Sequence, residues 1–165
     1  RDSEVMKAAL SAAETGQLVL GTMHTVNVTQ TLSRLTDAFP VEQHAQVRLQ
    51  LSELIRGVIC QRLLPTIKPG MRPALEIMVS TPQIRKLILE NKHSDIQKQM
   101  QNGALYGMQT FDQSLAKLYQ EGHIDMETAK RLPGNGYLGG YFAGCHYVGY
   151  PRGDGQLVRG GGVNA

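Results

Sequence analysis

The sequence has few of the residues that mark several protein classes. It has no tryptophan and two cysteines, and aromatic residues make up 5% of its 165 positions. A four-cysteine zinc cluster is excluded, and no two histidines have the HxH or HxxxH spacing of a metal site, so we expect no metal site. Cys60 and Cys145 allow one disulfide, but we expect a reduced pair, as in cytosolic proteins. No apolar run approaches the roughly 20 residues of a membrane span.

The chain also has little net charge. The chain carries 17 Lys and Arg against 14 Asp and Glu, a net charge of +3 with no basic run, so a nucleic-acid partner is not indicated. Hydrophobic residues reach 41%, which is enough for a core. Because the chain starts with Arg1 and shows no basic-then-apolar leader, we expect no secretory signal and a missing natural N-terminus.

Apolar spacing and capping residues predict helices and strands over the first 132 residues. A helix from Asp2 or Ser3 to Gly16, a strand over 17–24 and a helix from Asn27 or Thr29 are followed by a long helix over 41–59. Strands at 58–67 and 73–79 flank a turn at 68–70. Helices then follow from Thr81, from Ser94, over 110–121 and from Asp125 to Leu132. Early strands and late helices favour an α/β core with a helical C-terminal part.

The composition changes sharply after Pro133. Residues 134–165 hold 11 of the 18 glycines and 5 of the 9 Tyr and Phe residues. Such a segment has too few aliphatic side chains to offset its ordering entropy, which favours a disordered tail. A glycine-aromatic adhesive segment is the alternative.

The strongest candidate for chemistry is the segment Gly21-Thr-Met-His-Thr25, at the end of the predicted strand 17–24. In open α/β sheets, ligands bind beyond the carboxyl ends of the strands. His24 can therefore be a sensor of phosphate or bound water, or a hydrogen-bonded strand-end histidine with a structural role. The sequence contains no GxxxxGK[ST], so the chain cannot build a phosphate-binding loop by itself.

Several short motifs occur in an order that resembles one family. In chain order they are Arg1-Asp2, Ala12-Ala-Glu-Thr-Gly16, Leu18-Val-Leu-Gly-Thr-Met-His-Thr25, Phe39-Pro40, Gln61-Arg-Leu63, Ala74-Leu-Glu-Ile-Met78, Thr81-Pro-Gln-Ile-Arg-Lys-Leu87 and Gly107-Met-Gln-Thr-Phe-Asp112. Residues 1–132 resemble the C-terminal portion of pilus-retraction (twitching-motility) ATPases of the PilT/PilU type, within the type II/IV secretion-system ATPases. The cysteine-free turn after Gln61-Arg-Leu63 favours this retraction branch over branches that carry a four-cysteine zinc insert there.

The resemblance implies a fold and a domain organisation. Residues 1–80 would be the C-terminal half of a RecA-like P-loop NTPase core with a truncated α/β sheet. Residues 81–132 would form a helical C-terminal subdomain, and residues 133–165 would be a Gly/Tyr-rich tail that the family does not share.

The resemblance also implies a function. The chain would be a fragment of a homo-hexameric motor that hydrolyses ATP, with ATP and Mg²⁺ as cofactors of the full-length protein, to power type IV pilus retraction. Without a P-loop, the isolated chain would be inactive; the alternative is a catalytically inactive assembly or oligomerisation module. The motor would be cytoplasmic and peripheral at the inner membrane, with the pilus platform protein of that membrane as its partner.

The site residues that the resemblance implies fall into three groups. His24 would lie near the γ-phosphate and report its presence, with Thr22 and Thr25 beside it as catalytic residues. Nucleotide-binding residues would be Arg1 and Asp2, at the end of a Walker B segment, and Arg62. The retraction motif would comprise Ile84, Arg85, Lys86 and Leu87. Its apolar stripe, which Ile88 continues, packs on the core or meets a neighbouring subunit or the platform protein.

Overall fold

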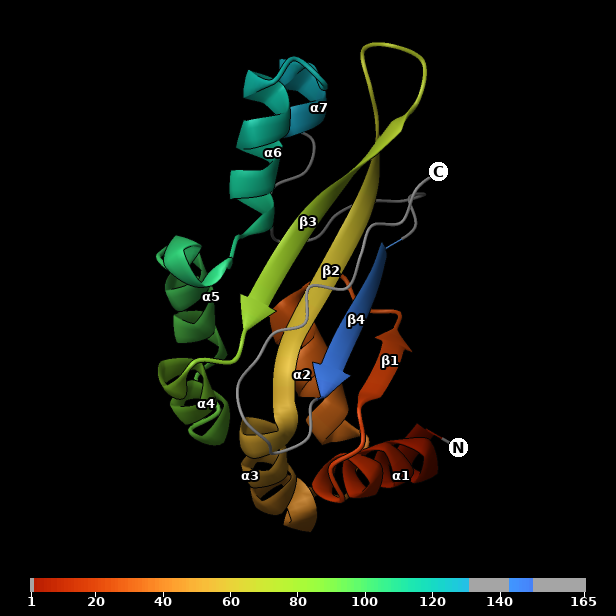
Figure 1. The fold of residues 1–165 in the computed structure, drawn as a ribbon, viewed down its shortest axis with the longest axis vertical. Helices are drawn as coiled ribbons and strands as arrows, with labels where there is room; N and C mark the ends of the chain where they lie inside the picture. The colour runs from red at the N-terminus through yellow and green to blue at the C-terminus, as the bar shows by residue number, and fades with distance from the viewer. Residues whose placement is uncertain (1, 131–142, 150–165) are drawn as a thin grey trace.

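A long antiparallel hairpin forms the spine of this structure, a computed structural model that describes residues 2–130 and 143–149. Strands β2 (Ile55–Pro65) and β3 (Met71–Val79) pair from Gly57 opposite Val79 to Pro65 opposite Met71. Strands β1 (Val19–Met23) and β4 (Ala143–Gly149) complete a sheet in the order β1-β4-β2-β3 (Figure 1). Since β4 is antiparallel to both neighbours, β1 and β2 run in the same direction.

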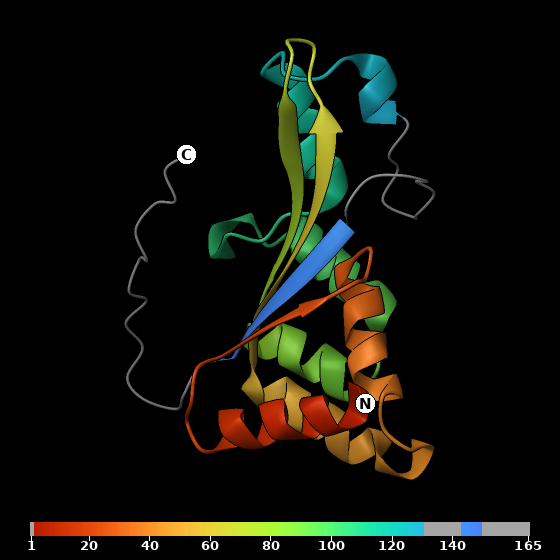
Figure 2. The ribbon, with the colours of Figure 1, turned by 90° about the vertical axis from the view of Figure 1, so that its right-hand side faces the viewer.

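The described residues also form seven α-helices, which leave one face of the sheet uncovered by helices (Figure 1). They are α1 (Asp2–Glu14), α2 (Val28–Asp37), α3 (His44–Leu54), α4 (Pro82–Leu89), α5 (His93–Gln101), α6 (Phe111–Gln120) and α7 (Met126–Lys130), with 3₁₀ turns at Val41–Gln43 and Ala104–Tyr106. Helix α2 lies beside the sheet when the sheet is seen edge-on (Figure 2), and α6 packs on β3. Within the described ranges, every helix is too short or too polar to cross a bilayer.

The hairpin separates a buried face from a more open one. Val58, Cys60, Arg62 and Leu64 of β2 alternate inward, and Ala74, Glu76 and Met78 of β3 do the same; all seven are at most 5% exposed. The side chains between them are half-buried or exposed, such as Ile59 at 37%. This period of two, which strand geometry imposes, places two charged residues, Arg62 and Glu76, on the core side of the sheet.

Most predicted elements are confirmed, and the clearest error lies at the end of the helix expected over 41–59. Helix α3 ends at Leu54 and the chain enters β2 directly at Ile55. Ile55 and Val58 fit the apolar stripe of a helix, but they are also β-branched residues that pack well on a pleated sheet. Pairing with β3 decides in favour of the strand.

The expected disordered tail is wrong for residues 143–149, because they form β4. A strand between β1 and β2 gains backbone hydrogen bonds on both sides, and this pairing does not depend on aliphatic side chains. The rest of the Gly/Tyr-rich tail, 131–142 and 150–165, lies outside the described residues.

The expected reduced cysteine pair is also wrong. Cys60 is disulfide-bonded, and the strand register places it opposite Cys145 of β4. The two cysteines are far apart in the sequence, so their spacing carried no sign that adjacent strands bring them together.

Gly103, between α5 and the following 3₁₀ turn, lies where an added Cβ would approach the Gln99 carbonyl oxygen to 2.9 Å. That oxygen belongs to helix backbone and cannot give way easily. We therefore expect Gly103→Ala to lower the free energy of unfolding by about 1–3 kcal/mol in urea denaturation. Gly122→Ala is the control, since its φ of +70° brings strain of about 1 kcal/mol but no contact within 4 Å. If Gly103→Ala lowered the free energy of unfolding by less than Gly122→Ala, the steric argument would be contradicted.

Candidate functional site

His24 directly follows the last residue of β1, Met23, and its side chain is exposed. The segment 24–27, which we call the His24 loop, joins β1 to α2. In the register through β4, Met23 is level with Cys60, so the His24 loop lies at the height of Arg62 on β2. The structure thus places two of the predicted site residues at about the same level along the sheet, with His24 exposed and Arg62 on the buried face.

The first turns of α2 hold the His24 loop in place. The hydroxyl oxygens of Thr25 and Thr31 lie 2.7 Å apart and share a buried hydrogen bond. The Val26 amide donates to Gln30 Oε1 at 2.8 Å, and Asn27 caps α2 by accepting from the Gln30 amide. Thr25 is 1% exposed, so its hydroxyl supports the loop from within, whereas Thr22 on β1 is exposed like His24.

Arg62 reaches the loop from the buried side of β2. Its Nη2 donates to the Val26 carbonyl oxygen at 3.2 Å, and its guanidinium lies 4.3 Å from the centre of the Phe111 ring. Burial lowers the pKa of Arg62, and the carboxylates of Glu76 and Asp112 act in the opposite direction. In this arrangement Arg62 fixes the loop backbone and stacks on the first residue of α6.

Glu76 is a site residue that the sequence analysis missed. It is 1% exposed on β3, and its Oε1 accepts a hydrogen bond from the amide of Val28, the first residue of α2, at 2.8 Å. Burial raises the pKa of Glu76, while the amides of Val28 and Phe111 and the Arg62 charge lower it. The available signal was the alternation Ala74, Glu76, Met78, which places a carboxylate at an inward position.

The raised pKa of Glu76 gives the unfolding free energy a specific pH dependence. The raised pKa means that the folded state binds the proton of Glu76 more tightly than the unfolded state does. Protonation of Glu76 therefore stabilises the fold, and this gain appears as the pH falls from above the raised pKa toward the ordinary value of 4.5. Each unit of the rise contributes about 1.4 kcal/mol. We therefore expect the stability of the wild type, relative to Glu76→Gln, to increase from pH 7 to pH 5 in urea titrations. A relative decrease would mean that Arg62 outweighs burial.

The remaining predicted residues lie elsewhere. Ile84 and Leu87, with Ile88, are 0%, 5% and 2% exposed, so the apolar stripe of α4 packs on the core of this chain. Lys86 is exposed with its Nζ 3.9 Å from Glu90, and Arg85 donates from Nε to Ser80 Oγ at 3.3 Å. Of the two charged residues of this motif, Lys86 is therefore exposed and Arg85 is half-buried, and α4 lies apart from the His24 loop (Figure 1). Asp2 is the first residue of α1, and Arg1 lies outside the described residues.

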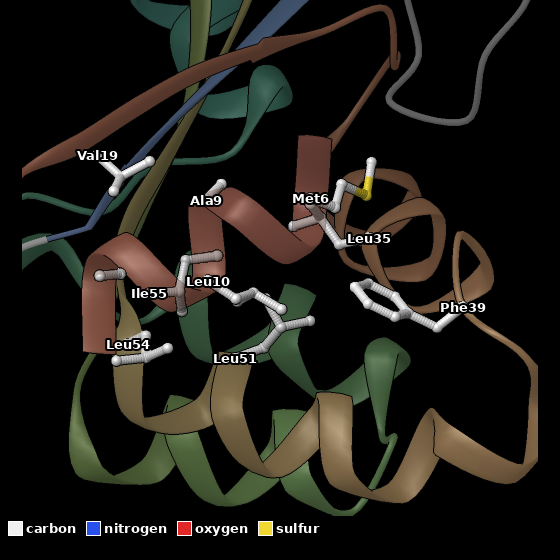
Figure 3. Close-up of a pocket in the computed structure, with 10 residues that line it drawn as sticks. Met6, Ala9, Leu10, Val19, Leu35, Phe39, Leu51, Leu54 and Ile55 are labelled. Carbon is white, nitrogen blue, oxygen red and sulfur yellow. The ribbon is translucent and has the colours of Figure 1, made fainter. Parts of the chain in front are cut away.

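An apolar cavity of about 40 Å³ lies between α1, α2 and α3 (Figure 3). Its lining includes Met6 and Leu10 of α1, Leu35 of α2, Phe39 in the segment after α2, and Leu51 of α3. Among the residues that the structure describes, no charged side chain lines this cavity, so these residues offer nothing to a phosphate. We assign it to the packing of α1 on the core.

The chemistry of the His24 edge fits contact with an oxyanion. The exposed imidazole of His24 and the hydroxyl of Thr22 can both donate hydrogen bonds to a phosphate oxygen. Over residues 2–130 and 143–149, no group of three His, Cys, Asp or Glu side chains is placed to hold a metal ion. The described residues therefore fit one side of a phosphate group but do not form a magnesium site by themselves.

Known proteins are similar to most of this chain. The type II/IV secretion system protein family matches residues 1–133. The type IV pilus retraction ATPase PilT of Pseudomonas aeruginosa is 44% identical over 82% of this chain and 40% of its own length. A twitching motility protein of Neisseria gonorrhoeae is 45% identical over 82% of this chain and 36% of its own. A crystal structure of the pilus retraction motor PilT with bound ADP matches with a TM-score of 0.73 at 44% identity, over 81% of this chain and 37% of that one.

Proposed function

Because the chain belongs to the type II/IV secretion system protein family, we propose that it is the downstream part of a motor subunit that hydrolyses ATP to retract type IV pili. The single observation that carries the proposal is the 44% identity to a pilus retraction ATPase over 82% of the chain. The chain spans 40% and 36% of the lengths of the two relatives named above, so the proposal concerns a longer protein.

In this proposal His24 contacts the γ-phosphate of ATP. Bound ATP with Mg²⁺ supplies the phosphoanhydride bond that is broken. The exposed imidazole donates a hydrogen bond to a phosphate oxygen from the carboxyl end of β1, and the Thr22 hydroxyl adds a second donor. Thr25 and Arg62 keep the His24 loop in position through their buried contacts. Arg1 and Asp2 would complete the nucleotide side of the site.

The motor would act as a homo-hexamer on the cytoplasmic side of the inner membrane, where it meets the pilus platform protein. Helix α4 supports this role, because Ile84 and Leu87 anchor it in the core while Lys86 faces outward. A charged helix face fixed on a rigid base can pass a change of subunit angle to a neighbour.

A second candidate is a catalytically inactive assembly module of the same family. The observation that favours it is the absence of GxxxxGK[ST] from all 165 residues. Such a module would join rings with an intact relative and contribute no turnover.

ATP hydrolysis by two proteins tests the proposal: the 165-residue chain and the product of the complete reading frame. We expect steady turnover by the complete protein and none by the chain alone. Absence of turnover in a folded complete protein would contradict the motor and favour the assembly module. ATP turnover by the isolated chain would refute the proposal that it is an inactive assembly module. It would also show that hydrolysis does not require a phosphate-binding loop upstream of this chain.

A further inference from the structure

Two buried charged residues, Arg62 and Glu76, lie on neighbouring strands between the His24 loop and the start of α6. Glu76 Oε1 accepts from the amide that begins α2, and the amide that begins α6, at Phe111, also acts on this carboxylate. Its Oε2 has no hydrogen bond of good geometry within the described part of the chain. This carboxylate of β3 thus accepts a hydrogen bond at the N-terminus of α2, and the amide at the N-terminus of α6 acts on its pKa.

Arg62 makes the same connection from β2. Its guanidinium donates to the Val26 carbonyl oxygen on one side and covers the Phe111 ring on the other. In the hairpin register Arg62 is opposite Ala74 and Glu76 is opposite Cys60, so the two charges are diagonal neighbours on the buried face. Each member of the pair therefore acts on both the loop side and the α6 side.

The start of α6 is itself attached to β3 beside Glu76. The backbones of Gln109 and Ile77 exchange two hydrogen bonds of 3.1 and 2.8 Å. The Gln109 side chain donates to the Leu75 carbonyl oxygen, and Ser114 Oγ accepts from the Leu75 amide. A shift of α6 along β3 would carry the Phe111 ring and amide away from Arg62 and Glu76.

We infer that Arg62 and Glu76 are positioning residues that make the His24 loop and the start of α6 open and move as one unit. The inference deepens the proposed function, since it names how the C-terminal helices influence the residue that faces ATP. It depends on that function only for its enzymatic test. Arg62 and Glu76 form one buried site between the His24 loop and the start of α6, and coupling between these two segments can pass through that site.

Hydrogen–deuterium exchange of the complete protein tests the physical part without any assay of turnover. In the wild type, amides of 25–31 and of 109–114 should exchange with the same opening free energy and the same dependence on denaturant. Glu76→Gln and Arg62→Lys should each speed exchange in both segments by about tenfold. Asp95→Asn, which removes an exposed carboxylate paired with Lys98, is the matched control and should leave both segments unchanged.

Steady-state kinetics provide the second test. Glu76→Gln and Arg62→Lys should lower kcat by about tenfold and keep KM for ATP within about twofold, because they displace His24 and leave the upstream nucleotide contacts in place. If the wild type itself shows no turnover, the proposed function fails while the exchange test still decides the inference. A change confined to one segment in both variants, or different opening free energies in the wild type, would overturn the inference. The wild-type measurement decides even where a variant does not fold.

Discussion

Replacing His24 by alanine in the complete protein is expected to lower ATP turnover by about two orders of magnitude. The imidazole is exposed at the end of β1 and the loop beneath it is held by Thr25, Asn27 and Arg62. Truncation therefore removes the proposed donor to the γ-phosphate without removing packing, and the loss should appear in kcat. Turnover and thermal unfolding of the same preparation measure the two effects separately.

Leu20→Ala is a matched control for this variant. Leu20 lies on β1, the strand that leads to His24, and is 68% exposed, so its truncation should change neither turnover nor stability by a large amount. Unchanged turnover in His24→Ala would refute the proposed phosphate contact. It would leave His24 as a strand-end residue with a structural role.

Phe111→Ala is expected to reduce the free energy of unfolding by about 3–5 kcal/mol. The side chain is 1% exposed, and its ring supports the Arg62 guanidinium at 4.3 Å. Truncation leaves a cavity at the base of α6 and removes a cation–π contact from a buried charge. Urea denaturation measures the loss.

Tyr106→Ala provides the comparison for Phe111, because this aromatic ring is 64% exposed. Its truncation should change stability by about 0.5 kcal/mol or less. A loss below about 1 kcal/mol for Phe111→Ala would mean that the surrounding helices close over the cavity.

Local signals in the sequence predicted the helix starts well. Asn27 and Thr81 are helix caps in the structure, and Thr110 forms a capping box with Gln113 at the start of α6. These contacts span three residues, so the information lies within a short window. His24 at the end of a strand was predictable for the same reason. The resemblance to the type II/IV secretion-system ATPases, made from motif order, is confirmed.

Features that depend on strand pairing were not predictable from short windows. The end of α3 at Leu54, the strand at 143–149 and the disulfide of Cys60 all follow from which strands are neighbours. The contact of Arg62 with the loop is of the same kind, since 36 positions separate it from Val26. Its shared site with Glu76 exists only once β2 and β3 are in register.

The place of β4 in the sheet has a consequence for synthesis on the ribosome. Val19 of β1 pairs with Gly149, and in the described part of the chain β1 is hydrogen-bonded to β4 alone. The β2–β3 hairpin can close as soon as Val79 emerges, whereas the pairing of β1 with β4 requires that Gly149 has been made. Among the described strands, the pairing of β1 with β4 therefore forms after the β2–β3 hairpin, although β1 precedes both hairpin strands in the chain.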